Sequence, residues 1–150
     1  MARYAGPRVR PGLASLIVWL LLSGCRRSYD PPAPVLTLVP TGMLVTGHAA
    51  KADEQMMCLI AGASLQATVY AHEPTVTIVL TAFTPTPSKP PGMMIYFDSQ
   101  LVATDPMTAG QPQAFVYRVA TERGERVLRV MVPSISPGVL CVREVVVTQP

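Results

Sequence analysis

Three cysteines are the residues of this 150-residue chain whose side-chain chemistry is easiest to assign. An ionised thiol is a nucleophile, so a cysteine can be alkylated to a thioether or oxidised with a second thiol to a disulfide. Cys25 closes an apolar stretch near the start of the chain, whereas Cys58 and Cys141 lie far apart in the body. The three therefore divide into one cysteine of the leader and one candidate pair.

The leader before Cys25 has the anatomy of a secretory signal. Residues 1–10 carry three arginines and no acid, and residues 13–22 form an apolar run of ten residues with Ser15 as its one polar member. A membrane-spanning helix needs roughly 20 apolar residues, and this run is about half as long. The leader therefore predicts an exported chain.

The last four residues of this leader, Leu22-Ser23-Gly24-Cys25, resemble the lipobox of bacterial lipoproteins. The resemblance implies that the Cys25 thiol takes a diacylglyceryl group, that a dedicated peptidase removes residues 1–24, and that the new amino group is acylated, for example with palmitate. Two or three acyl chains on one residue give durable attachment, so the implied partner is a membrane. An ordinary cleaved signal, an uncleaved anchor and a coincidental cysteine are the alternatives.

The residue that follows Cys25 indicates in which membrane a lipoprotein is located. In Gram-negative lipoproteins an aspartate there tends to retain the protein in the inner membrane, but this chain has Arg26. The resemblance thus implies the outer membrane of the cell envelope, either facing the periplasm or exposed at the surface; in a Gram-positive source it implies the outer face of the single membrane. Residues 25–34 are polar and proline-rich and predict either a short extended tether or a disordered N-terminus, ahead of a body at 35–150.

Once Cys25 is set aside, two cysteines remain, Cys58 and Cys141. An even number of cysteines in an exported chain favours a disulfide between them. On the chain-entropy account, closing a loop of this length adds up to roughly 4.5 kcal/mol of stability. Two buried thiols are the alternative. A metal pair is disfavoured because neither cysteine has another Cys or His at ligand spacing, so no metal site is expected.

Catalytic constellations are scarce in the sequence. His48 and His72 are expected at strand ends, and the segment Gly62-Ala63-Ser64-Leu65-Gln66 begins like a nucleophile elbow but ends in glutamine. Methionine thioethers suit Cu(I), yet the adjacent pairs Met56-Met57 and Met93-Met94 would point to opposite faces of a strand. We expect no enzyme, no catalytic residue and no cofactor.

Carboxylates in loops are candidate ligands for calcium, because calcium is coordinated by oxygen atoms. The candidates are Asp53, Glu54, Asp98 and Asp105, and no ligand spacing supports them. Nucleic acid is disfavoured as a partner because phosphate neutralisation dominates its binding. Three of the twelve basic residues lie in the leader, and the remaining nine only balance the nine acids.

The sequence of the body, residues 35–150, predicts a series of short strands. Eight segments are rich in Val, Thr, Ile and Tyr and are separated by Pro, Gly, Ser or Asp, which predicts strands and turns. The segments are 35–39, 43–48, 64–71, 75–83, 93–98, 114–119, 127–132 and 140–148. A helical turn is expected only within residues 49–62. The predicted fold is therefore an all-β, antiparallel two-sheet β-sandwich.

Two segments add a further resemblance. Residues 92–102 and 138–147 are similar to the middle and last strands of jelly-roll carbohydrate-binding modules, although immunoglobulin-like sandwiches give the same strand counts. Few aromatic residues are available as sugar platforms, and one of Tyr96 and Phe97 must face outward because they are adjacent in a strand. The proline-rich loop at 84–92 is expected to be a solvated linker or a stiff extended surface.

Together these inferences predict a lipid-anchored envelope lipoprotein with a non-enzymatic binding or structural β-sandwich. The alternative is a carbohydrate-binding-module-like domain, with or without calcium dependence. An envelope protein or a polysaccharide is the expected partner of the body, besides the membrane at Cys25.

Overall fold

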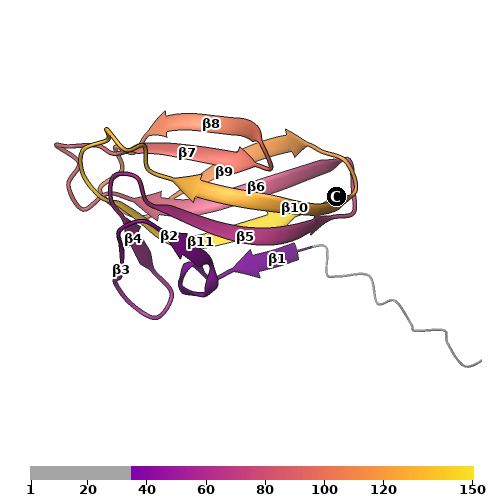
Figure 1. Ribbon diagram of the computed structural model, residues 1–150, viewed down its shortest axis with the longest axis horizontal. Coiled ribbons are helices and arrows are strands. Elements are labelled where there is room, and N and C mark those ends of the chain that lie inside the picture. Colours follow the sequence, from indigo (N-terminus) through magenta and orange to yellow (C-terminus); the bar gives the residue numbers. More distant parts are fainter. Residues whose placement is uncertain (1–34) are drawn as a thin grey trace, which may run out of the picture. The chain divides into compact units, whose positions relative to one another are not determined.

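A computed structural model describes residues 35–150, which fold into eleven β-strands and one short 3-10 helix (Figure 1). The strands are β1 (Val35–Leu38), β2 (Leu44–Thr46), β3 (Ala49–Lys51), β4 (Met57–Leu59), β5 (Ser64–Ala71), β6 (Thr75–Phe83), β7 (Gly92–Phe97), β8 (Gln100–Pro106), β9 (Gln113–Ala120), β10 (Gly124–Met131) and β11 (Leu140–Thr148); the helix η1 covers Pro40–Gly42. Within this range no helix has the length and hydropathy of a membrane span. The expected signal sequence, Cys25 and the tether lie outside the described residues.

The strands form the predicted two antiparallel sheets. Sheet A has the order β3-β4-β11-β6-β9, with β1 also paired to β11, and sheet B has the order β2-β5-β10-β7-β8. In Figure 1, β5, β7, β8 and β10 cross in front of β6, β9 and β11. From β5 onward the chain changes sheet at every connection except the β7–β8 hairpin. The all-β sandwich is therefore confirmed.

The core lies between the two sheets and follows from alternation along the strands. In β6 the side chains of Val76, Ile78 and Leu80 are fully buried, and the residues between them are half-buried on the outer face. The same alternation separates the buried Met93 from the half-buried Met94 in β7, as predicted for adjacent methionines. The buried residues of both sheets make one apolar cluster.

The helical turn expected within residues 49–62 is wrong. This segment is a hairpin in which β3 pairs with β4, and the side-chain carboxylate of Asp53 accepts two backbone N–H groups in the connecting turn at 2.8 and 2.7 Å. Met57 and Leu59 are buried while Cys58 is half-exposed between them. This period of two in β4, together with pairing to β11, outweighs the helix propensity of the alanines.

The strand β8 was not predicted either. It pairs with β7 through a hairpin whose turn contains Asp98, a non-glycine residue with a φ of 55°. A register shift between Ile95 and Tyr96 breaks the regular alternation, and β8 is an edge strand with little buried surface. Both features remove the period-two pattern by which a strand is predicted from sequence.

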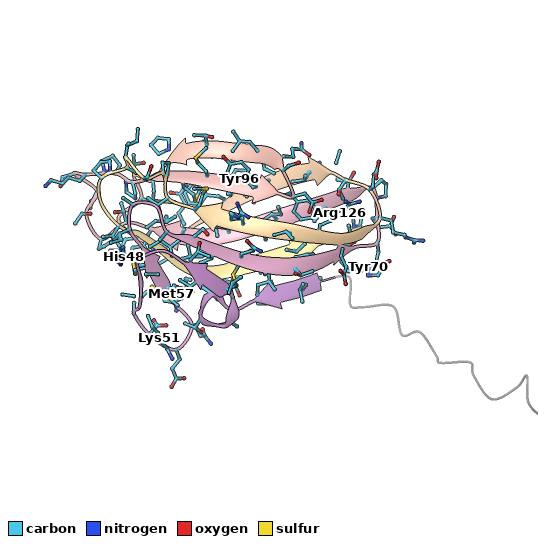
Figure 2. The ribbon with its side chains drawn as sticks, viewed as in Figure 1. His48, Lys51, Met57, Tyr70, Tyr96 and Arg126 are labelled. Carbon is cyan, nitrogen blue, oxygen red and sulfur yellow. A yellow bond between two sulfur atoms is a disulfide. The ribbon has the colours of Figure 1, made fainter. Side chains whose placement is uncertain are left out.

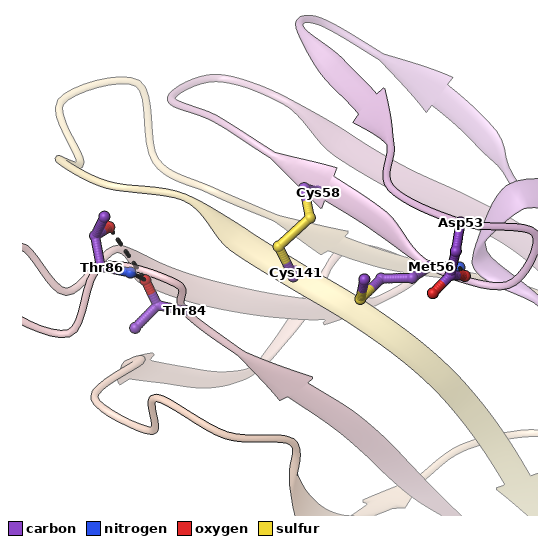
Figure 3. Close-up of a disulfide and its surroundings, with 6 residues drawn as sticks. All are labelled: Asp53, Met56, Cys58, Thr84, Thr86 and Cys141. Atoms are coloured by element: carbon purple, nitrogen blue, oxygen red, sulfur yellow. Dashed lines mark hydrogen bonds between the residues drawn. A yellow bond between two sulfur atoms is a disulfide. The ribbon is translucent and has the colours of Figure 1, made fainter.

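The disulfide is confirmed: Cys58 and Cys141 are bonded, with their Cα atoms 4.0 Å apart (Figure 3). The two residues stand directly opposite each other in the antiparallel pair β4–β11. The bond therefore fastens the β3–β4 hairpin to the strand at the centre of sheet A.

Candidate ligand-binding surface

The residues that were considered for nucleophilic chemistry lie apart. His48 lines a hollow of about 390 Å³ next to Cys58, whereas His72 lies just after β5 with its ring 4.5 Å from the ring of Tyr70. Figure 2 shows His48 and Tyr70 at opposite ends of the sandwich. Ser64 is 6% exposed, and its hydroxyl shares a hydrogen bond of 2.6 Å with that of Thr46. Ser64 begins a strand, so the strand-to-helix turn of a nucleophile elbow is not formed.

The four carboxylates considered for calcium are also separated, and three of them have other partners. Asp53 holds the β3–β4 turn, Asp98 binds Arg126 across 3.1 Å and accepts the N–H of Val127 at 2.8 Å, and Asp105 accepts a hydrogen bond from Tyr117. Among residues 35–150, no group of three or more His, Cys, Asp or Glu side chains is arranged to hold a metal ion. These residues therefore do not fit a calcium site.

The aromatic side chains follow the predicted alternation. Phe97 is 2% exposed in the core, and Tyr96 lies half-buried on the outer face of sheet B. Tyr117 points inward from β9, and burial together with the hydrogen bond to Asp105 raises the pKa of its phenol above the ordinary value of 10.0. Tyr70 and Tyr96 share the outer face of sheet B but lie on β5 and β7, on either side of β10, so the exposed rings form no cluster on the residues that the structure describes.

The outer face of sheet A is hollowed at two places. The first hollow, of about 410 Å³, is lined by Thr37, Leu38, Val39, Gln55, Thr81, Pro112, Arg143 and Glu144. The second, of about 480 Å³, is lined by Thr75, Thr77, Arg118, Thr148, Gln149 and Pro150. Both hollows rest on β6 and β11, so they lie along the same strands.

A row of valines forms the floor between the two hollows. Val146 of β11 is opposite Val79 of β6, which is opposite Val116 of β9. Val116 is 63% exposed, and the other two are half-buried. We call the two hollows and this row the trough. Thr77 and Thr81 stand at its two ends, four residues or roughly 13 Å apart along β6.

The polar groups of the trough have free hydrogen-bonding capacity. The hydroxyls of Thr37, Thr75, Thr77, Thr81 and Thr148 have no hydrogen-bond partner among residues 35–150, unlike the hydroxyl of Thr46 on sheet B. Within the same range, Arg118, Arg143 and Glu144 make no ion pair, whereas Arg126 pairs with Asp98 and Glu122. A threonine hydroxyl both donates and accepts, and the aliphatic floor is apolar. This combination suits a ligand with many hydroxyls and apolar C–H faces.

Local structure shapes the walls of the trough. The β3–β4 turn supplies Gln55, and its position is fixed by the disulfide and by a hydrogen bond of 2.7 Å from the Thr41 hydroxyl to the carbonyl of Glu54. At the other end, the side chain of Gln149 accepts the N–H of His72 at 2.6 Å and donates to the carbonyl of Tyr70 at 2.9 Å. The contacts of Gln149 hold the C-terminal segment against the end of β5.

The proline-rich loop at 84–92 is tied to its neighbours rather than free. The N–H of Thr84 donates to the carbonyl of Ala109 at 2.8 Å, and the N–H of Gly92 donates to the hydroxyl of Ser136. Gly138, with a φ of +79°, lies so close to Lys89 that an added Cβ would be 2.0 Å from its carbonyl oxygen. The loop is thus held at Thr84, Lys89 and Gly92 while residues 85–89 are exposed, and it borders a third hollow, of about 730 Å³, beside Pro112.

The trough was missed by the sequence reasoning, although a signal for it exists. In the segment Thr75-Val76-Thr77-Ile78-Val79-Leu80-Thr81 every even-numbered residue is a large apolar one, which places the threonines together on the other face. The partners of these threonines on β1, β9 and β11 depend on strand order, which the pattern does not contain.

Comparison with known proteins gives structural neighbours only. No family model and no curated protein sequence matches the chain. The CBM36-1 domain of a multidomain xylanase from the hindgut metagenome of Trinervitermes trinervoides is similar at a TM-score of 0.68 and 10% identity, over 77% of this chain and 98% of that domain. The carbohydrate-binding module CBM36 in complex with calcium and xylotriose is similar at 0.63 and 12% identity, over 74% and 97%.

A third neighbour is the mannan binding module from Man5C, with a TM-score of 0.61 and 17% identity over 75% of this chain and 97% of that module. Residues 35–150 thus have the jelly-roll β-sandwich fold of carbohydrate-binding modules. The jelly-roll resemblance of residues 92–102 and 138–147 is confirmed at the level of the fold. At these identities the likeness establishes the fold alone.

Proposed function

We propose that this chain is a lipid-anchored, non-catalytic polysaccharide-binding protein that holds a polysaccharide chain in the trough of sheet A. The observation that carries the proposal is the extent of the likeness. The described body spans 97–98% of modules whose own descriptions name xylanase, xylotriose and mannan. The likeness in fold thus extends over nearly the whole length of these sugar-binding modules and not over a part of them.

The chemistry of the trough supports the same function. Threonine hydroxyls, the Gln55 amide and the arginine guanidiniums supply donors and acceptors, and the valine row supplies an apolar floor. Binding sites of this kind combine a mainly apolar surface with a few placed polar groups that fix orientation. Because the trough follows β6 and β11 and has hollows at both ends, it favours an internal stretch of a long chain over a chain end.

Calcium is not part of this proposal. The carboxylates that could have held it stabilise turns, pair with Arg126 or accept a hydrogen bond from Tyr117. We therefore expect binding to be unchanged by a chelator, although the similar module CBM36 is described in complex with calcium and xylotriose.

The test is affinity electrophoresis of the full chain in gels that contain xylan, galactomannan or no polysaccharide, each with and without EDTA. The proposal predicts retardation by at least one of the two polysaccharides, equal with and without EDTA. A chain that migrates identically in all gels contradicts the proposed function, and retardation that EDTA abolishes contradicts the calcium-free form of it.

The lipid anchor is the second part of the proposal. The lipobox at Leu22–Cys25 supports cleavage before Cys25, acylation of that residue and location at the outer membrane of the cell envelope. Intact mass of the membrane-extracted protein tests it. We expect a chain that begins at Cys25 and carries acyl chains, and Cys25→Ser should abolish both. A chain that retains residues 1–24 or lacks lipid would contradict the anchor but leave the polysaccharide site untouched.

A further inference from the structure

The outer face of sheet B, on the side of the sandwich opposite the trough, carries a short charge pattern along β10. Glu125, Val127 and Arg129 alternate with the inward-facing residues of the strand, so their side chains project from the same face. Glu125 and Arg129 are exposed, and Val127 lies half-buried between them. Glu125 and Arg129 lie two residues before and two residues after Val127. Reversing the direction of the strand about Val127 therefore exchanges the positions of the negative and the positive charge.

Neither charge has an opposite partner within the described chain. Four residues along a strand separate Glu125 from Arg129 by roughly 13 Å, which is too far for an ion pair. Arg129 instead donates to the side-chain oxygen of Gln66 at 3.2 Å, which fixes the direction of its guanidinium. The neighbouring Arg126, by contrast, has Asp98 and Glu122 as partners.

Large side chains with exposed apolar surface surround this pattern. Tyr70 on β5 is opposite Glu125, and Tyr96 on β7 is opposite Arg129. Both tyrosines are labelled in Figure 2. Tyr70 is 39% exposed, and at the two edges of the same face Leu44 and Leu101 are 61% and 47% exposed. Tyrosine and arginine with aliphatic neighbours are the composition of protein–protein contacts.

We propose that this face binds a second copy of the chain, sheet B against sheet B, about a twofold axis that runs between the two facing Val127 side chains. An axis in the plane between the sheets and perpendicular to β10 makes the two copies of β10 antiparallel. Glu125 of each copy then faces Arg129 of the other, which gives two identical ion pairs. Facing sheets pack about 10 Å apart, a gap that Glu and Arg side chains can bridge.

The same operation places Tyr70 of each copy over Gln66 of the other and Val127 over Val127. The aromatic and aliphatic surface is covered at the same time as the charges are paired, so the interface is complementary in both respects. Because the trough lies on the other sheet, it stays open in both copies. The pair would present two polysaccharide sites, and binding to one long chain would gain in avidity.

Cross-linking through the axis tests the proposal, with the full chain in membranes isolated from expressing cells. In the variant Val127→Cys, a short bis-maleimide should convert most of the protein to a covalent dimer, whereas Thr77→Cys on the opposite face should give at least ten-fold less. In the Val127→Cys background, Arg129→Glu alone should reduce the dimer at least ten-fold, and Glu125→Arg with Arg129→Glu should restore it. Thermal unfolding of each variant checks that the fold is retained.

Restoration by the double charge reversal supports the arrangement. Three results would overturn it: no dimer from Val127→Cys, equal cross-linking at Thr77→Cys, or a double reversal that stays as poor as Arg129→Glu. None of these bears on polysaccharide binding by the monomer.

Discussion

Tyr117 of β9 donates a hydrogen bond from its phenol to the carboxylate of Asp105 in β8, across 3.0 Å. These strands are the neighbouring edges of the two sheets, so the bond ties sheet A to sheet B along one side of the sandwich. Burial and the carboxylate raise the pKa of Tyr117 above its ordinary value of 10.0. The protonated phenol is therefore favoured in the fold.

This pKa shift predicts how stability depends on pH. The unfolded chain releases the Tyr117 proton near pH 10 while the folded chain retains it, so the contribution of Tyr117 is fully present below pH 10 and is lost as the pH rises further. Tyr117→Phe should lower the free energy of unfolding by about 1–2 kcal/mol at neutral pH, because Asp105 loses its donor. Its stability should then fall less steeply above pH 10 in urea titrations.

Tyr96→Phe is the matched control for that experiment. The Tyr96 hydroxyl lies on the outer face of sheet B and has no hydrogen-bond partner among the described residues. Its removal should leave the free energy of unfolding at neutral pH as it is. An unchanged slope in Tyr117→Phe would argue against the inter-sheet bond.

The disulfide should stabilise the β3–β4 hairpin more than the rest of the sandwich. β3 pairs only with β4, and β4 pairs with β11 through three residue pairs that include Cys58 and Cys141. The double variant Cys58→Ala, Cys141→Ala should lose about 2–5 kcal/mol of stability. Hydrogen exchange should show the loss of protection concentrated in residues 49–59, with β6 largely protected. A uniform loss would contradict this anchoring role.

Two glycines allow a test of the loop contacts. Gly138 has a φ of +79° and no room for a Cβ beside Lys89, whereas a Cβ at Gly42 would meet nothing within 4 Å. Gly138→Ala should therefore cost more than about 3 kcal/mol, and Gly42→Ala should stay within about 0.5 kcal/mol of the parent. The midpoints of urea unfolding compare the two, and similar midpoints would show that the loops are not locked together.

The fold class was predictable from sequence because the long central strands alternate strongly. The segments 64–71, 75–83 and 140–148 coincide with β5, β6 and β11. The short strands β3 and β4 were not predicted because their pattern is too brief and their alanines favour no strand. They form because β4 pairs with β11 and is joined to it by the disulfide, and β3 then pairs with β4. The contacts with β11 are long-range ones.

The candidate site could be predicted from the sequence only in part. Alternation in β6 places Thr75, Thr77 and Thr81 on one face, but the hollows also need Gln55 from a distant turn and Arg143 from a bulged strand. A bulge changes the direction of side chains without a clear sequence signal. Three of the four carboxylates considered for calcium, Asp53, Asp98 and Asp105, bind other groups of the fold, which the sequence pattern does not contain.

Binding of a polysaccharide in the trough is best tested by the dissociation constant for the polysaccharide that retards the chain, measured by titration with the parent and two variants. Thr77→Val with Thr81→Val removes one hydroxyl from each end of the trough without changing side-chain shape. It should raise Kd roughly thirty-fold, which corresponds to two hydrogen bonds at about 1 kcal/mol each. Thr108→Val makes the same change at an exposed residue outside both the trough and the outer face of sheet B, and it should leave Kd within about two-fold. Equal Kd values for all three proteins, or a loss confined to Thr108→Val, would contradict binding in the trough.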